Sequence, residues 1–406
     1  MSKKFIILMT VFIDVLGIGI IIPVLPFYVE SFGASDFIVT LLFAVFSFFS
    51  FFSAPLLGAW SDRIGRRPVL IASIASTALG WFVFALSTNI IWLFIGRIID
   101  GLAAGNFPIA QSYLIDIAKN DKEKTTNLGL IGAIFGIGFI IGPVIGGTLS
   151  QISLSLPFYF VGVLATINMI LAFKYLPETN KNINVLKKIE FNPIKPIWES
   201  LKKKNLRYSF IAWFLFGTAL AGQQAILSLY LNRKFHFDSL TISLFFAGMG
   251  AILILNQVVF LKKVWLKYFS ENKIIIAGTL FLSLSFFLMG VNYLLIIVIG
   301  SLLLSFSQSS LRVVLTSQVV KKALINEQGM ILGVMASVMS LSMIVGPIIA
   351  GILFTIKFNL PFFASAILSV AAFVIVYCDI NCNNSAPSKL SEEELKIAEQ
   401  KIEFIS

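Results

Sequence analysis

Three ionisable residues, Asp14, Arg97 and Asp100, lie inside long apolar stretches of this sequence. In a helix that rises 1.5 Å per residue, Asp14 would lie about 14 Å into its stretch, and Arg97 and Asp100 would share one helix face. A lone charge at that depth in a bilayer costs at least about 2.5–3.5 kcal/mol, so these side chains are expected to face a cavity or a partner. We predict that Asp14 carries protons, that Arg97 tunes it, and that Asp100 is either a second carrier or the structural partner of Arg97. The alternative is a static ion pair.

The surrounding sequence is more apolar than a soluble domain requires. Of its 406 residues, 58% are hydrophobic and 40 are Phe, whereas a soluble domain is about 45–50% apolar. Apolar runs of about 18 residues or more recur along the chain, and each can cross a bilayer as a helix. They are longer and more continuous than the strands of a membrane barrel, which have about 10 residues. We therefore predict an all-α integral membrane protein whose twelve spanning helices lie at 5–29, 38–60, 68–87, 90–115, 126–150, 157–175, 208–231, 239–262, 272–291, 294–319, 328–354 and 360–379.

Internal repetition divides the chain into halves. Residues 128–149 align without gaps to residues 332–353, and eight of the 22 positions are identical, among them a Gly-Pro pair. Two repeats related by an axis along the membrane normal form a transporter architecture. We predict two pseudo-symmetric six-helix bundles, at 1–176 and 208–380, joined by a cytoplasmic linker at 177–207 and followed by a cytoplasmic tail at 381–406.

Lysine and arginine indicate the orientation in the membrane. With the N-terminus inside, the inner segments hold 26 of the 31 basic residues, as the positive-inside rule requires. Both termini are then cytoplasmic, and the net charge of +11 reflects topology rather than a nucleic-acid partner. The linker places Ile194, Ile197, Trp198 and Leu201 on one helical face, which predicts either a helix on the inner leaflet or a solvated connection.

A short loop between the second and third predicted helices combines charge with glycine. Gly65 allows a tight turn, and Asp62 and the arginines can hold neighbouring helix ends together through charge-assisted hydrogen bonds. Such a latch has to break if that end of the protein opens. Alternatively, the arginines only fix the topology. The pattern consists of Gly58, Asp62, Arg63, Gly65, Arg66 and Arg67.

This loop resembles the signature loop of the major facilitator superfamily, and three further motifs occur in the expected order. Asp14, with the glycines and prolines that follow it, resembles the first-helix motif of twelve-helix drug–proton antiporters. Arg97-x-x-x-Gly101-x-x-x-Gly105 resembles their fourth-helix motif. Within this group the likeness is greatest to bacterial tetracycline exporters. The fifth predicted helix resembles the motif that marks exporters, through Gly132, Gly136, Gly142, Pro143, Gly146 and Gly147.

The glycines and the proline of the fifth helix also have a physical reading. Glycines four residues apart let helices approach closely, and Pro143 favours a kink. A bent helix of this kind at the contact between the halves can control leak, while ordinary helix packing is the alternative.

The resemblance implies a function. Proteins of this group export small amphipathic or organic compounds in exchange for protons by alternating access, in the bacterial inner membrane, with no cofactor beyond the proton gradient. It also implies that Asp62, Arg66 and Asp116 form a latch of the outward-facing state. We expect a monomer whose partners are a small-molecule substrate, protons and the lipid bilayer. The alternative is proton-coupled transport, including import, of a polar metabolite such as an organic anion or a siderophore.

Other functions fit the sequence less well. It contains no nucleophile–base motif, metal-ligand cluster or phosphate-binding loop, so an enzyme is not predicted. A receptor or scaffold would not need the acids and the charged loop. The resemblance also has a gap, because Gly80 stands where tetracycline exporters carry an acid in the third helix, and no acid occurs in the ninth, at 274–291.

Polar and aromatic residues of the other helices are candidates for the substrate cavity. Gln308 and Arg312 lie on one side of the tenth helix, and if Arg312 faces the cavity an anionic substrate group is expected. For the neutral residues, hydrogen bonds between helices are the alternative. The candidates are Tyr28, Tyr113, Gln223, Gln224, Tyr230, Asn256, Gln257, Gln308 and Arg312.

Overall fold

The computed structural model describes residues 2–180, 194–322 and 328–385, and every element in this part of the chain is a helix. Twelve helical segments there are long and apolar enough to cross a membrane. The predicted all-α membrane fold is confirmed. The first half contains α1 (Lys3–Glu30), α2 (Asp36–Ile64), α3 (Arg66–Ala85), α4 (Ile90–Leu102), α5 (Asn106–Asp116), α6 (Asp121–Ser150) and α7 (Leu156–Tyr175). The second half contains α8 (Ile194–Lys202), α9 (Lys204–Phe235), α10 (Ser239–Leu255), the π-helix η1 (Asn256–Trp265), α11 (Leu266–Tyr268), α12 (Glu271–Met289), α13 (Leu294–Lys321), α14 (Gln328–Ile356) and α15 (Leu360–Ser385).

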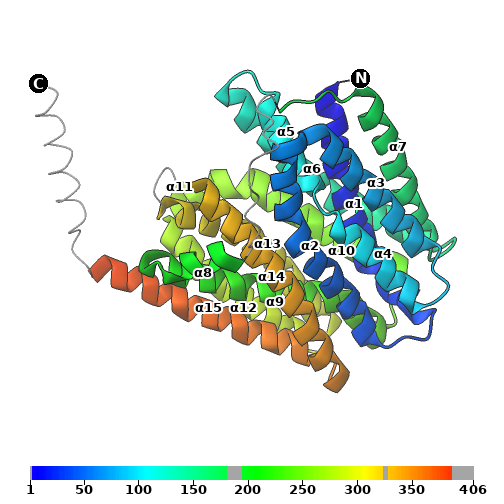
Figure 1. Cartoon of the computed structure of the whole chain (residues 1–406). Helices are drawn as coiled ribbons and strands as arrows, with labels where there is room; N and C mark the ends of the chain where they lie inside the picture. The colour runs from blue at the N-terminus through cyan, green and yellow to red at the C-terminus, as the bar shows by residue number, and fades with distance from the viewer. Residues whose placement is uncertain (1, 181–193, 323–327, 386–406) are drawn as a thin grey trace, which may run out of the picture.

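The helices form two groups, α1 to α7 and α9 to α15 (Figure 1). The groups touch mainly through two helix pairs, α2 with α14 and α6 with α10. In spanning order, α2 and α14 are the second and eleventh segments, and α6 and α10 are the fifth and eighth. The second segment of one half corresponds to the eighth, and the fifth to the eleventh. The two-fold relation between the halves therefore converts one pair into the other. The predicted pair of pseudo-symmetric six-helix bundles is confirmed.

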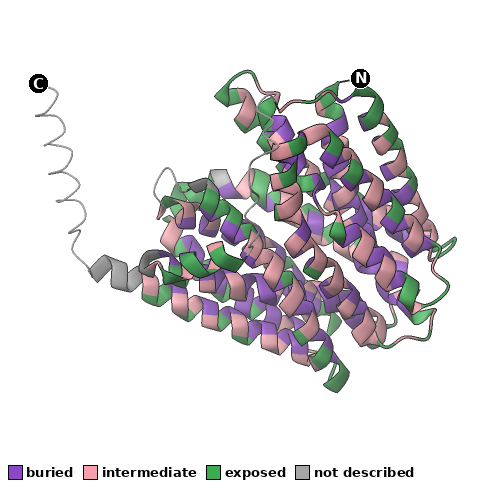
Figure 2. Ribbon diagram, in the orientation of Figure 1, coloured by how far each residue is buried: buried purple, intermediate pink, exposed green. Residues whose placement is uncertain are grey.

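The pattern of burial differs from that of a water-soluble protein. Buried positions line the inside of each bundle and exposed ones its outside (Figure 2). Many exposed side chains are large and apolar, such as Leu295 at 71% and Ile367 at 69%. Outward-facing apolar side chains on helices whose backbone is fully hydrogen-bonded are what a lipid environment requires.

One end of the molecule holds the two bundles together. Arg233, near the end of α9, binds Glu30 at 2.8 Å and Asp36 at 2.9 Å, at the facing ends of α1 and α2. The hydroxyls of Ser150 and Ser239 lie 2.7 Å apart and join α6 to α10. We call this end the sealed end. Among described residues, the hydrogen bonds between the bundles lie in the half of the molecule nearest this end, and the bundles diverge toward the N-terminus (Figure 1).

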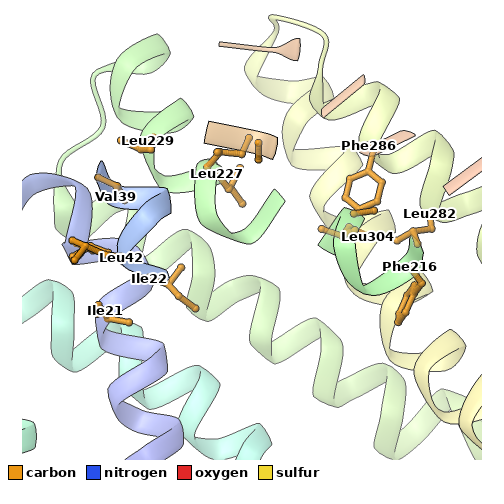
Figure 3. Packing of buried hydrophobic residues seen from close by; sticks show 14 of the residues in the cluster. Ile21, Ile22, Val39, Leu42, Phe216, Leu227, Leu229, Leu282, Phe286 and Leu304 are labelled. Carbon is orange, nitrogen blue, oxygen red and sulfur yellow. The ribbon is translucent and has the colours of Figure 1, made fainter. Parts of the chain in front are cut away.

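Apolar packing continues across the sealed end. One cluster of buried side chains runs from α1 and α2 into α9 and on through the second bundle. Figure 3 shows Ile22 of α1 and Leu42 of α2 in this cluster with Leu227 of α9. Asp238 caps α10 beside this contact by accepting from the backbone N–H of Thr241, and hydrogen bonds from Thr241 hold the pKa of Asp238 below its usual value.

The linker contains the predicted helix, α8, but its apolar residues divide between two surroundings. Ile197 and Leu201 pack against the core, whereas Ile194 and Trp198 are about 60% exposed, at 59% and 61%. The helix rests on α9 and α14. The first part of the linker, 181–193, and the tail from 386 onward lie outside the described residues. The last helix, α15, runs to Ser385 and so extends into the predicted tail.

Candidate functional site

The carboxylate of Asp14 is held inside the first bundle by an asparagine. The side-chain amide of Asn106, on α5, donates to Asp14 Oδ1 at 3.0 Å and to Thr77 Oγ1, on α3, also at 3.0 Å. Asn106 is only 3% exposed. A buried carboxylate needs hydrogen-bond donors, and Asn106 supplies one.

The predicted partners of Asp14 lie in the same region. Arg97 and Asp100 form a buried ion pair of 3.3 Å on α4. The guanidinium of Arg97 also lies over the Phe46 ring, 4.2 Å from its centroid, where a cation is favoured. Thr77, which accepts from Asn106, lies on α3 one turn before Gly80, whose backbone packs against Asp100, and the charge of Asp100 acts on Asp14. Asp14, Asn106, Thr77, Asp100 and Arg97 therefore form one network, which we call the coupling network.

A break in the fourth spanning segment places Asn106. The predicted spanning segment at 90–115 is confirmed as Ile90–Asp116, but it is interrupted, because α4 ends at Leu102 and α5 begins at Asn106. A side chain at Gly105 would meet Leu57 Cβ at 2.8 Å, so glycine lets the broken backbone approach α2. Pro108 lies within the first turn of α5, where the missing N–H costs no hydrogen bond.

The coupling network lies within the first bundle and not at the contact between bundles. A narrow pocket beside Asp14 is lined by residues of that bundle alone: Thr10, Ile13, Asp14, Ile74, Thr77, Asn106, Ala165 and Asn168. Asp14 lines this pocket and also has a hydrogen-bond partner, whereas Arg97 and Asp100 are paired with each other. Sequence analysis had not identified Asn106 or Thr77. The Gly105-Asn106-x-Pro108 sequence, a helix-breaking signal in an apolar run, could have directed attention to Asn106.

We expect Asn106→Ala to reduce proton-driven transport at least tenfold, because it leaves Asp14 without its described donor and cuts the link to Thr77. Exchange of substrate without a gradient should change less than threefold. Both rates can be measured in the same membrane vesicles. Asn168→Ala is the matched control, since Asn168 lines the same pocket but donates to Thr10, at 2.7 Å. Equal loss in the two variants would contradict a specific role for Asn106.

The charged loop forms a second cluster, at the end of the first bundle opposite the sealed end. Arg66 binds Asp62 and, at 3.3 Å, Asp116. Its guanidinium also donates to Ser61 Oγ at 2.7 Å. These contacts join the ends of α2, α3 and α5. Both acidic partners of Arg66 belong to the first bundle.

Glu178, which sequence analysis did not consider, completes the loop cluster. Its carboxylate accepts from the backbone N–H of Arg66 at 2.8 Å and of Arg67 at 3.0 Å, and so caps α3. Gly65 has φ +113°, and a Cβ there would lie 2.9 Å from Glu178 Cδ. Glycine is therefore required both by the backbone and by the approach of Glu178.

The expectation that this latch breaks when its end of the protein opens stays a prediction. In this structure the ion pairs of Arg66 are formed, and the hydrogen bonds between bundles lie toward the other end. Asp62, Arg66 and Asp116 all belong to the first bundle. Arg63 is half-buried near the end of α2, and a Cβ at Gly58 would meet no atom within 4 Å.

Gly65→Ala is expected to destabilise the protein by about 1–3 kcal/mol, because alanine resists this backbone conformation and would strike Glu178. Gly58→Ala, the same change in the open interior of α2, should leave stability unchanged or raise it by up to about 1 kcal/mol. Thermal unfolding of the two variants in detergent measures the contrast. Equal midpoints would contradict this account of Gly65.

The glycines of α6 face both bundles. A Cβ at Gly142 would lie 2.9 Å from Gly19 Cα, and Gly146 lies against Ile20, so these positions let α6 approach α1. Gly136 meets Ile254 at 2.8 Å and Gly147 meets Ser243, both in the second bundle. Gly132 has no atom within 4 Å of a Cβ, and α6 is a continuous helix through Pro143.

Four cavity candidates make side-chain hydrogen bonds within the protein, which was the alternative for the neutral residues. The hydroxyls of Tyr28, Tyr113 and Tyr230 donate to Phe84 O, Pro177 O and Asn292 Oδ1 at 3.1, 2.8 and 3.0 Å. Asn256 is fully buried and donates to Phe306 O while accepting from Trp265 Nε1, both at 2.8 Å. Long apolar helices satisfy such groups by packing them against a neighbouring backbone.

The remaining candidates differ in exposure. Gln223 is 4% exposed, and its amide nitrogen has no hydrogen-bond partner among described residues. Gln224 and Gln308 are partly buried, and Gln257 and Arg312 are exposed. These five stay candidates.

Twelve spanning segments in two related bundles, with ionisable groups held inside one of them, form the architecture of a membrane transporter. The chain belongs to the Major Facilitator Superfamily, whose sequence profile matches residues 7–264 and 258–402.

Curated relatives are named as drug-resistance proteins. The chain is 33% identical over 280 residues to the class C tetracycline resistance protein of Escherichia coli, covering 67% of this chain and 69% of that protein. It is 34% identical over 292 residues to the class D protein of Salmonella ordonez, covering 68% and 70%. It is 30% identical over 275 residues to the quinolone resistance protein NorA of Staphylococcus aureus, covering 67% and 69%.

Solved structures confirm the fold. The nucleoside transporter NupG superposes with a TM-score of 0.76 at 15% identity, over 93% of this chain and 100% of that one. The human organic anion transporter MFSD10 superposes with a TM-score of 0.71 at 22% identity, over 92% and 98%.

Proposed function

We propose that this protein exports a small amphipathic organic compound in exchange for protons, by alternating access. The coupling network is the observation that carries the proposal. Placing a carboxylate inside a membrane bundle, beside an amide donor and an ion pair, costs free energy. We therefore expect this carboxylate to have a function in transport. The names of the tetracycline and quinolone resistance relatives support the substrate class.

We infer that both termini face the cytoplasm of a bacterial inner membrane, from the distribution of lysine and arginine. The sealed end then faces outward, and the structure corresponds to the state open to the cytoplasm. Substrate enters from the cytoplasm in this state. After the bundles rock and the sealed end opens, a proton from outside reaches Asp14 while substrate leaves.

The proton has a defined effect in this scheme. When Asp14 takes up a proton, the coupling network loses one negative charge, and the carboxyl group itself becomes able to donate a hydrogen bond. The side-chain oxygen of Asn106, which is buried and has no partner among described residues, can accept from it after the amide turns. Each protonation state of Asp14 therefore has its own hydrogen-bond arrangement. Rearrangement at Asn106 passes the change to α5.

Everted membrane vesicles with an acidified lumen test the proposal. Tetracycline and a fluorescent quinolone are suitable first compounds, and each should accumulate in the lumen and leave when the gradient is collapsed. Vesicles lacking the protein are the control. Accumulation that needs the protein but persists without a proton gradient would overturn the proposed coupling.

A second function, proton-coupled transport of an organic anion, is supported by Arg312, an exposed cation within α13. The two functions differ in direction. Export predicts gradient-driven accumulation in everted vesicles, whereas import predicts it in right-side-out vesicles whose exterior is acidic. We propose a monomer that needs no cofactor in either case.

A further inference from the structure

A polar stripe runs along one face of α13. Its members are three or four residues apart, which is the spacing of one helical face. In a spanning helix such a stripe faces protein or water and not lipid. The stripe consists of Ser301, Ser305, Gln308, Arg312 and Thr316.

Exposure changes along this stripe. Ser301 and Ser305, nearer the sealed end, are buried, Gln308 is partly buried, and Arg312 is exposed. Arg312 lies in the half of α13 that ends at Lys321, away from the sealed end. It is therefore accessible from the side on which the bundles diverge.

The face of α13 that carries Arg312 differs from its main apolar face. The exposed side chains of Leu295 at 71%, Ile299 at 48%, Leu302 at 40% and Val313 at 36% lie about 80–140° around the helix from Arg312. Leu294 at 38% shares the face of Arg312 but lies about five turns away, at the start of the helix. Arg312 thus remains reachable on the polar face of α13.

Arg312 also lacks an acidic neighbour. Three other arginines, Arg66, Arg97 and Arg233, each face a carboxylate. No ion pair or hydrogen bond of the Arg312 guanidinium occurs among described residues, and no acid acts on it electrostatically. An unpaired cation within a membrane segment is costly, so its counter-ion must come from outside the fold.

We propose that Arg312 binds an anionic group of the transported compound, a carboxylate in the first instance. A guanidinium offers a planar pair of donors that matches a carboxylate, and Gln308, one turn away, offers a neutral donor beside it. This inference rests on the proposed transport function and narrows it to amphipathic compounds that carry an acid.

The experiment compares a quinolone carboxylic acid with its primary amide, which has nearly the same size and no acid. Binding to the detergent-solubilised full chain and gradient-driven uptake into everted vesicles are both measured. We expect the wild type to bind the acid about ten times more tightly than the amide. Arg312→Gln should lose this preference while binding the amide as before, and Arg312→Lys should keep part of it.

Val313→Ala is the matched control, because it changes the lipid side of the same helix. Wild type that binds acid and amide equally, or an Arg312→Gln variant that keeps the preference, would overturn the inference while leaving transport standing. Failure of the wild type to transport either compound, or any other compound screened under a gradient, would instead overturn the proposed function.

Discussion

Asp14→Asn is expected to abolish proton-driven accumulation of substrate, with a loss of at least about a hundredfold, comparable to removal of a general acid–base group. The change keeps the shape of the side chain, which still contacts Asn106, but removes the carboxylate that α1 contributes to the coupling network. Accumulation in everted vesicles under an imposed gradient measures the loss. Substrate exchange without a gradient should persist, because the bundles can still rock.

Asp100→Asn separates this role from general damage to the network. It leaves Arg97 buried without a full counter-charge, which typically costs about 3–5 kcal/mol. We expect it to lower thermal stability, whereas Asp14→Asn should not. Undiminished accumulation by the Asp14 variant would refute the coupling assignment, and an unfolded Asp14 variant would show instead that the carboxylate is structural.

Arg233→Gln is expected to open the sealed end. It removes the cation between Glu30 and Asp36 and leaves two carboxylates facing each other at the junction of the bundles. Partly exposed pairs contribute little individually, but a cation shared by two acids contributes about 1–2 kcal/mol, roughly a 5- to 30-fold change in population. We therefore expect more of the state that is open at this end.

Cysteines at Ser150 and Ser239, whose hydroxyls are 2.7 Å apart, can report this change through disulfide formation after Cys378 and Cys382 are replaced by serine. Cross-linking should fall several-fold with Arg233→Gln and much less with Arg233→Lys, which keeps the charge. Identical cross-linking in all three backgrounds would mean that apolar packing alone closes the sealed end.

The sequence was sufficient to predict the fold because each membrane-spanning helix can be recognised from its own residues. A long apolar run can hide its backbone from lipid only as a helix, so twelve runs and their repeat determined the architecture. The same reasoning found Asp14, Arg97 and Asp100, since charges in apolar runs are rare and costly. It also predicted the helix α8 in the linker. It did not predict that Ile197 and Leu201 would pack against the second bundle while Ile194 and Trp198 stay exposed.

What remained hidden depends on contacts between distant segments. Glu178 lies 112 residues after Arg66, and nothing local indicates that it caps α3. Tyr113 reaches Pro177 in the same region for the same reason. Asn106 was missed because its significance comes from the break in the fourth segment, which folding against α1, α2 and α3 stabilises. Periodicity alone cannot identify a helix interrupted by only three residues.

That interruption makes α5 a short rigid rod with a different site at each end. It has 11 residues and so a length of about 16 Å, with Asn106 at its start and Asp116 at its end. Asn106 holds the acid of the coupling network, and Asp116 holds Arg66 of the loop cluster. A tilt of this rod about residues 103–105, set by whether Asp14 is charged, would loosen or tighten Arg66 without moving the rest of the bundle. In the proposed scheme, α5 would thereby connect protonation of Asp14 mechanically to the loop cluster.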